Sequence, residues 1–190
     1  MKKILIFVLV AIVVFFAIKI SISPKDIDKN KIYTYCKNNG YNTEYCCLVD
    51  FSIPQGLNRF FVYSFKENKI IKESLCAQGK GKNNNIFNKT FSNKIGSNYS
   101  SLGKYKIGKL RPMSSSYFKE GFTVYGLDTT NSNAYSRAIL IHGGNAPFET
   151  FPLPCLPVSK GCFAVSNPMM EYLKELTKRV SKPLLLYAYK

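Results

Sequence analysis

A proline-rich loop between two short apolar runs constrains the fold of this chain more than any other feature. The apolar runs cover residues 139–141 and 163–165, and the loop over residues 148–157 contains prolines at positions 152, 154 and 157. Proline fixes φ and has no backbone N–H, so this loop cannot form a helix or a central strand. We therefore expect two buried strands joined by a stiffened loop.

Each apolar run borders a residue suited to nucleophilic chemistry. His142, the only histidine, follows the first run, and Cys162 precedes the second within a Ser-x-Gly-Cys turn. A thiol becomes a useful nucleophile at neutral pH when its pKa is lowered or a base takes its proton, and imidazole can do both. With six cysteines in the chain, one lying near the histidine is weak evidence by itself. Their placement at two strand ends beside one loop makes His142 and Cys162 the candidate base and nucleophile.

Glycines accompany both candidates. Gly143 and Gly144 leave space beside the imidazole, and Gly161 allows a tight turn before Cys162. In such a turn we expect the amide N–H groups of Gly161 and Cys162 to converge on a carbonyl oxygen that becomes an oxyanion. This arrangement is typical of acyl chemistry.

The same residues resemble the catalytic signature of the murein L,D-transpeptidase catalytic domains of the YkuD-like superfamily. The centre of the signature is Ser159-Lys160-Gly161-Cys162, preceded by Ile141-His142-Gly143-Gly144. Weaker similarities follow one another upstream, at residues 48–52, 59–62, 79–81, 91–93, 96–97, 100–103, 105, 126–128, 133–134 and 137–139. Together the matches cover roughly residues 45 to 190, and their order and spacing make the resemblance specific.

Two positions differ from the family's pattern. Gln78 stands where a histidine commonly precedes the Gly-x-Gly of the early motif, and Val158 stands where an arginine often precedes Ser-x-Gly-Cys. Neither position is the nucleophile or the base. The implied chemistry is therefore retained, while substrate contacts at these two positions are expected to differ.

The resemblance implies a cysteine-dependent L,D-transpeptidase that acts on peptidoglycan stem tetrapeptides. Cys162 would form a thioester with release of D-Ala, and a side-chain amine of a neighbouring stem would resolve it to a 3–3 cross-link. The thioester would also make the enzyme sensitive to carbapenems. The Gly143 carbonyl would orient the imidazole, and site support or substrate contacts are expected from Ser159, Gly144, Ser100, Ser101 and Arg137. For Arg137, the sequence leaves open a surface charge, a buried structural pair or a carboxylate anchor.

Two other functions fit the same residues. With water as the acyl acceptor, the enzyme would be an L,D-carboxypeptidase, because the acceptor depends on cleft shape and water exclusion. The other is a catalytically silent cell-wall-binding module, which the departure at Gln78 favours and which the intact His142 and Cys162 disfavour.

Composition predicts one mainly β domain. The chain has 190 residues with 46% hydrophobic content, 13 Tyr and 14 Phe without Trp, and many short apolar runs. The resemblance implies a YkuD-like β-sandwich with one or two short helices. We expect an antiparallel meander over residues 46–53, 59–65 and 69–77, a long loop over 79–101, and further strands at 102–107, 122–127 and 184–189. A helix should start at Asn167 and Pro168, with a core stripe formed by Met169, Met170, Leu173, Leu176 and Val180.

The N-terminal segment resembles an export signal. Two lysines precede an apolar run over residues 4–18, which matches a secretory signal and, extended to residue 22, gives a marginal membrane span. We expect residues 1–23 to be a signal peptide or membrane anchor, residues 24–44 a polar lead-in with a little helix before Gly40, and residues 45–190 the catalytic domain. The protein is then exported to the periplasm or cell envelope, and residues 4–22 would anchor it to the inner membrane if they are retained.

The charge balance suggests partners beyond the substrate. A formal net charge of +16 favours contact with anionic envelope surfaces. Nucleic acid is not an expected partner, because the basic residues form no recognisable binding motif in an exported chain.

The cysteines point away from a metal site. The chain has no C-x-x-C pair and a single imidazole, so we expect no metal and no cofactor. If Cys162 is a free thiol, disulfides can form among the other five cysteines, with Cys36 and Cys46 close in sequence, and the remaining candidates are Cys47, Cys76 and Cys155.

Overall fold

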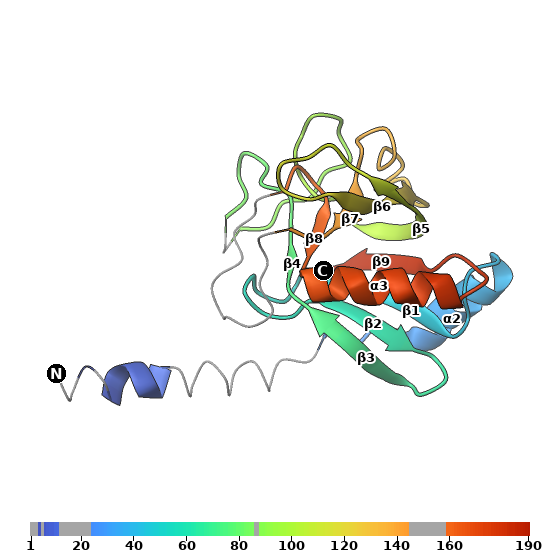
Figure 1. Ribbon diagram of the computed structural model, residues 1–190, viewed down its shortest axis with the longest axis horizontal. Helices are drawn as coiled ribbons and strands as arrows, with labels where there is room; N and C mark the ends of the chain where they lie inside the picture. The colour runs from blue at the N-terminus through green and yellow to red at the C-terminus, as the bar shows by residue number, and fades with distance from the viewer. Residues whose placement is uncertain (1–3, 5, 12–23, 86–87, 145–158) are drawn as a thin grey trace.

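The computed structural model describes residues 4, 6–11, 24–85, 88–144 and 159–190. Within these residues the chain is mainly β, as predicted, with nine strands in one sheet and few helices. The spatial order of the strands is β3-β2-β1-β9-β5-β6-β7-β8-β4. The sandwich expected from the resemblance therefore takes the form of a single, strongly curved sheet (Figure 1).

The predicted meander is present at one end of this sheet. Strands β1 (Tyr45–Asp50), β2 (Phe60–Ser64) and β3 (Lys69–Ser74) pair antiparallel in sequence order. The third strand was expected to continue to Ala77, but it breaks at Leu75. After the break, β4 (Cys76–Ala77) pairs with β8 at the opposite end of the sheet. Leu75 alone thus separates β3 and β4, the first and last strands in the spatial order. The sheet therefore nearly closes on itself.

A buried arginine stabilises the closure between the two sheet ends. The side chain of Arg59 is fully buried, and its Nε donates a hydrogen bond of 2.7 Å to the carbonyl oxygen of Cys76. A buried carbonyl needs such a donor where the strand pairing is interrupted. The Cys76 carbonyl therefore keeps a hydrogen-bond donor where the chain passes from one end of the sheet to the other at Leu75.

The central strands form the long hairpin next to the active-site strands. Strand β5 (Gly103–Pro112) pairs antiparallel with β6 (Glu120–Gly126), with an irregularity between Ile107 and Leu110. Both strands are longer than the sequence predicted. Strand β9 (Leu185–Tyr189) lies between β1 and β5, parallel to β1. The predicted closing strand therefore becomes a central element of the sheet.

The candidate site lies on two short parallel strands. Strand β7 (Leu140–His142) pairs with β6 on one side and with β8 (Phe163–Val165) on the other. Both strands agree with the apolar runs predicted from sequence. The proline-rich loop between them, with Cys155 and Val158, lies outside the described residues.

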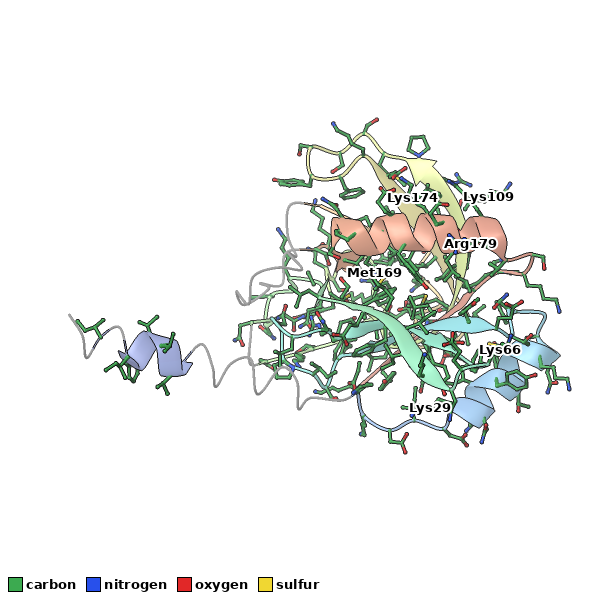
Figure 2. The ribbon with its side chains drawn as sticks, turned by 60° about the horizontal axis from the view of Figure 1, so that its bottom comes forward. Lys29, Lys66, Lys109, Met169, Lys174 and Arg179 are labelled. Carbon is green, nitrogen blue, oxygen red and sulfur yellow. The ribbon has the colours of Figure 1, made fainter. Side chains whose placement is uncertain are left out.

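Helix α3 (Asn167–Arg179) follows β8 directly, as predicted, and Ser166 is its N-cap. Its buried residues are Met169, Met170, Leu173 and Leu176, and Val180 ends the helix and packs against the same core. Figure 2 shows Met169 at the start of the helix and Lys174 and Arg179 farther along it. Lys174 forms an ion pair of 2.7 Å with Glu120, which ties α3 to the β5–β6 hairpin.

Helix α2 (Lys29–Asn38) occupies part of the segment expected to be a polar lead-in with a little helix. The side chain of Asp28 caps its N-terminus, and Gly40 with φ of +75° follows its C-terminus. Ile32 and Cys36 are buried against a second apolar cluster that includes Cys46 and Leu48 of β1. Strand β1 is therefore buried on both faces, because Cys47 and Val49 belong to the main core.

All five cysteines within the described residues are free thiols. Four of them, Cys36, Cys46, Cys47 and Cys76, are buried, and Cys162 is partly exposed. The disulfides considered from the sequence are thus not formed among these residues.

The expected export segment, residues 1–23, lies mostly outside the described residues. Among the helices that the structure describes, none combines the length and the apolar character needed to cross a membrane.

Candidate active site

His142 and Cys162 point to the same face of the sheet. In the register of β7 and β8, Ile141 lies opposite Phe163 and His142 opposite Ala164. Ile141 and Phe163 are in the main core, so the alternation of side chains places His142 and Cys162 together on the other face. Because Cys162 is two positions away from the residue opposite His142, the Cα atoms of His142 and Cys162 are about 8 Å apart. Within the described part of the chain, no hydrogen bond joins the two side chains.

The imidazole of His142 is held by its own following peptide and by an aromatic ring. Its Nδ1 lies 2.6 Å from the carbonyl oxygen of Gly143. Because a carbonyl can only accept, Nδ1 carries the proton, and in the neutral ring the lone pair is on Nε2. Phe118, from the tip of the β5–β6 hairpin, stacks on the imidazole with ring centroids 3.8 Å apart. Burial lowers the pKa of His142 below its ordinary value, and the Gly143 carbonyl opposes this shift.

Residues 159–162 form the nucleophile turn. Ser159 Oγ accepts the Gly161 N–H at 3.1 Å and donates to the Cys162 carbonyl at 2.8 Å. The Gly161 amide therefore already donates to Ser159. The Cys162 N–H has no backbone acceptor among the described residues. The expected role of these two amides as oxyanion donors stays a prediction.

Gly161 is required by the geometry of the nucleophile turn. Its φ is +118°, a conformation that side-chain-bearing residues rarely adopt. A Cβ at this position would lie 2.7 Å from the carbonyl oxygen of Tyr99 and 3.1 Å from a guanidinium nitrogen of Arg137. The turn is thus packed tightly against the loop formed by residues 79–101.

Two predicted support residues connect that loop to the nucleophile turn. Ser100 is buried, and its Oγ accepts the Gly79 N–H at 2.9 Å and donates to the Gly161 carbonyl at 3.1 Å. Arg137 is half-buried and donates to the carbonyls of Ser92, at 2.8 Å, and Tyr99. Arg137 therefore forms a clamp on backbone carbonyls, a contact that was not among the alternatives left open from the sequence.

The Cys162 thiol is a neutral group in this environment. Burial raises its pKa, while the Leu140 backbone amide and the charge of Arg137 act in the opposite direction. The thiol lies 3.7 Å from the carbonyl oxygen of Ala138, a residue with a positive φ of 52°. With a raised thiol pKa and a lowered imidazole pKa, the resting pair is a thiol and a neutral imidazole at neutral pH.

Other predicted positions have structural roles. Ser101 is buried and hydrogen-bonds Tyr105 at 2.8 Å, so it faces the core. Gln78 follows β4 on the side of Cys76, which belongs to the main core, whereas Ala77 shares the opposite face with Ala164. Gln78 is fully buried, and this alternation places its side chain on the core face. The departure from the family pattern at this position therefore lies in the core.

Two residues at the site were not identified from the sequence. Phe118 stacks on His142, although it lies in a stretch without apolar periodicity. Asn167 was recognised only as part of a helix start, yet its Oδ1 accepts the Gly144 N–H at 2.9 Å. Both line a cavity of about 300 Å³ beside Gly143 and Gly144. The described residues contain no group of His, Cys, Asp or Glu side chains able to hold a metal ion.

Comparisons with known proteins find several solved structures that are similar to this chain. The helical cell shape determining protein Pgp2 from Campylobacter jejuni shares 14% identity, with a TM-score of 0.50 over 80% of this chain and 50% of that chain. Bd1075 from Bdellovibrio bacteriovorus shares 16% identity, with a TM-score of 0.48 over 80% of this chain and 49% of that chain. An L,D-transpeptidase from Xylanimonas cellulosilytica shares 14% identity, with a TM-score of 0.44 over 82% of this chain and 68% of that chain.

The chain spans about half the length of the Bdellovibrio and Campylobacter structures. No curated protein sequence matches it. The model of the L,D-transpeptidase catalytic domain family matches residues 20–189, which is nearly the whole chain. This protein therefore belongs to the L,D-transpeptidase catalytic domain family.

Proposed function

We propose that Cys162 is the nucleophile and His142 the general base of a cysteine-dependent L,D-transpeptidase. The observation that carries this proposal is the placement of both side chains on one face of neighbouring strands, with Nδ1 of His142 directed to the Gly143 carbonyl. The lone pair on Nε2 is then free to take the thiol proton. Because both groups are neutral at rest, proton transfer accompanies the attack on the substrate.

The substrate we propose is a peptidoglycan stem tetrapeptide. The sulfur attacks the carbonyl carbon of the residue whose L-centre precedes the terminal D-Ala, and the oxyanion accepts the N–H of Cys162. The imidazolium returns its proton to the amine of D-Ala, which leaves, and a thioester remains. The side-chain amine of a neighbouring stem then attacks the thioester carbonyl and releases the thiol, which gives a 3–3 cross-link.

An L,D-carboxypeptidase uses the same residues with water as acceptor and remains the second candidate. The silent binding module has less support, because Gln78 lies on the core face and leaves the base and the nucleophile in place.

We also propose that the protein acts in the periplasm or cell envelope after export, with residues 4–22 as a retained anchor or a cleaved signal. Its net charge of +16 favours contact with anionic surfaces there.

Incubation with a disaccharide tetrapeptide, with and without a second stem peptide as acceptor, tests the reaction. Mass spectrometry of the products should show loss of D-Ala and, with the acceptor, a cross-linked dimer. Hydrolysed tripeptide alone would identify the carboxypeptidase. No product from a folded, reduced protein would contradict both activities and support the binding module. Cys162→Ala is the control for each product.

A further inference from the structure

One peptide group connects the imidazole of His142 to the start of helix α3. The carbonyl oxygen of Gly143 lies 2.6 Å from Nδ1 of His142, and the N–H of Gly144 donates to Oδ1 of Asn167 at 2.9 Å. These two groups belong to the same peptide unit. Because the donor is an N–H, the Asn167 atom that faces it must be the amide oxygen.

The geometry of a peptide group makes these two hydrogen bonds dependent on each other. The six atoms of the unit are planar, so fixing the direction of the N–H also fixes the direction of the C=O. Donation from the N–H also polarises the group and makes its carbonyl a better acceptor. The hydrogen bond to Asn167 therefore fixes the position of the Gly143 carbonyl and makes it a stronger acceptor for Nδ1 of His142.

The packing around Gly143 supports a specific fit. A Cβ built on Gly143 would overlap Oδ1 of Asn167 and would lie 3.1 Å from Met170. The asparagine side chain thus occupies the space that a larger residue 143 would need. Asn167 is itself placed by the Ser166 cap, whose Oγ accepts the Met169 N–H at 3.3 Å, and by the burial of Met169.

We propose that Asn167 is a positioning residue that fixes the orientation and the tautomer of His142 through the Gly143–Gly144 peptide. The proposal rests on the proposed function in one respect, namely that His142 is the base. Without Asn167 the peptide can rotate, Nδ1 loses its acceptor for part of the time, and the Nε2–H tautomer becomes populated. In that tautomer Nε2 cannot take the Cys162 proton.

Among the described residues, three charged side chains line the cavity beside this relay. Lys119 and Glu120 belong to the β5–β6 hairpin, and Glu171 lies on α3; all three line the same cavity. Lys174 pairs with Glu120 at 2.7 Å and with Glu171 at 3.0 Å, so their charges largely compensate. The charge of Arg137 acts on the Cys162 thiol. A change of charge at Asn167 should therefore be visible in the titration of His142.

The single histidine permits a direct test on the full chain in mild detergent. Long-range ¹H–¹⁵N spectra of histidine-labelled protein report the tautomer and the pKa of His142 alone, without any substrate. In the parent we expect protonated Nδ1 and unprotonated Nε2. Asn167→Ala should populate the Nε2–H tautomer and lower the pKa of His142. Asn167→Asp keeps the acceptor and adds a negative charge, so it should retain the Nδ1–H tautomer and raise the pKa.

A parallel measurement of carbapenem acylation connects the relay to chemistry. Loss of one hydrogen bond of ordinary strength predicts acylation roughly fivefold slower in Asn167→Ala, with Asn167→Asp closer to the parent. The matched control is Asn39→Ala, an exposed asparagine at the end of α2 that donates to the Tyr35 carbonyl.

The outcomes separate this proposal from the proposed function. An unchanged tautomer and pKa in both Asn167 variants would overturn the positioning role, even if Cys162 is acylated normally. A shifted tautomer in a protein that is never acylated would support the positioning role and contradict the proposed transpeptidase.

Discussion

The nucleophile turn, residues 159–162, and the base turn, residues 142–144, lie beside neighbouring strands but are held by different kinds of contact. The nucleophile turn depends on partners far away in sequence, such as Ser100 and the Arg137 clamp on Tyr99. The base turn is held by its own next peptide, with Phe118 and Asn167 as neighbours. The thiol position therefore depends on correct folding of the loop over residues 79–101, whereas the imidazole orientation depends on the adjacent peptide, the β5–β6 hairpin and the start of α3.

The largest expected effect comes from filling the space at Gly161. Gly161→Ala places a Cβ 2.7 Å from the Tyr99 carbonyl oxygen at a φ of +118°. We expect a loss of roughly 2–4 kcal/mol in unfolding free energy, because strain and overlap add. Acylation of Cys162 should fall by more than about 100-fold, since a displacement near 1 Å can have that effect. Urea denaturation and acylation rates measure the two effects.

Gly40→Ala is the matched control for Gly161→Ala. Gly40 also has a positive φ, +75°, but a Cβ there meets nothing within 4 Å. Gly40→Ala should lower the unfolding free energy by only about 1 kcal/mol, because it adds backbone strain and no steric overlap. Equal losses in the two variants would contradict tight packing of the nucleophile turn.

Arg137→Lys tests the long-range clamp. A lysine keeps the charge but cannot donate to Ser92 and Tyr99 with a planar fork. We expect a loss of about 1–2 kcal/mol in stability and slower acylation of roughly tenfold. Exposed Arg111→Lys is the control. Acylation as fast as in the parent would show that the clamp does not position Cys162.

Phe118→Leu tests how far the stacked ring of Phe118 supports the imidazole of His142. Loss of the stacked ring should remove about 0.5–1.5 kcal/mol of interaction and slow acylation by about two- to tenfold. Stability should change less than for Gly161→Ala, because the expected loss is that of one ring–ring contact. Tyr117→Leu, at a neighbouring residue that is 77% exposed, is the control. A similar slowing in both variants would assign the effect to the hairpin as a whole.

The smallest expected effect is the pH dependence of acylation. Burial lowers the pKa of His142 below 6.5, so more than half of the imidazole is still neutral at pH 6.5. The rate should therefore fall by less than about twofold between pH 8 and pH 6.5, and more steeply below. In His142→Ala only the thiolate reacts, and the raised pKa of Cys162 predicts a rise above pH 9. A parent midpoint above pH 7 would contradict a buried neutral base.

Local patterns in the sequence predicted much of the fold around the site. The apolar run at residues 139–141 overlaps β7, which ends at His142, the run at 163–165 coincides with β8, and the Asn167-Pro168 signal marks the start of α3. These elements were predictable because hydrophobic periodicity, strand length and helix-capping chemistry each depend on only a few consecutive residues. The placement of His142 and Cys162 on one face follows from the same alternation.

Contacts between distant segments could not be read from the sequence. Phe118 reaches His142 because the β5–β6 hairpin is longer than its apolar pattern suggested. The sheet closes at Leu75 because β4 changes partner, which no local pattern encodes. The Gly161 amide, which we predicted as an oxyanion donor, donates to a hydroxyl two residues earlier, a contact that no sequence pattern indicated. Short side-chain-to-backbone bonds of this kind compete with any expected backbone role.

The most direct test of the central claim is the intact mass of the reduced protein after incubation with a carbapenem. The account predicts one added ligand mass on the parent, none on Cys162→Ala and slower addition on His142→Ala. An adduct that persists in Cys162→Ala, or no adduct on folded parent protein, would contradict the assignment of Cys162 as the acylated nucleophile.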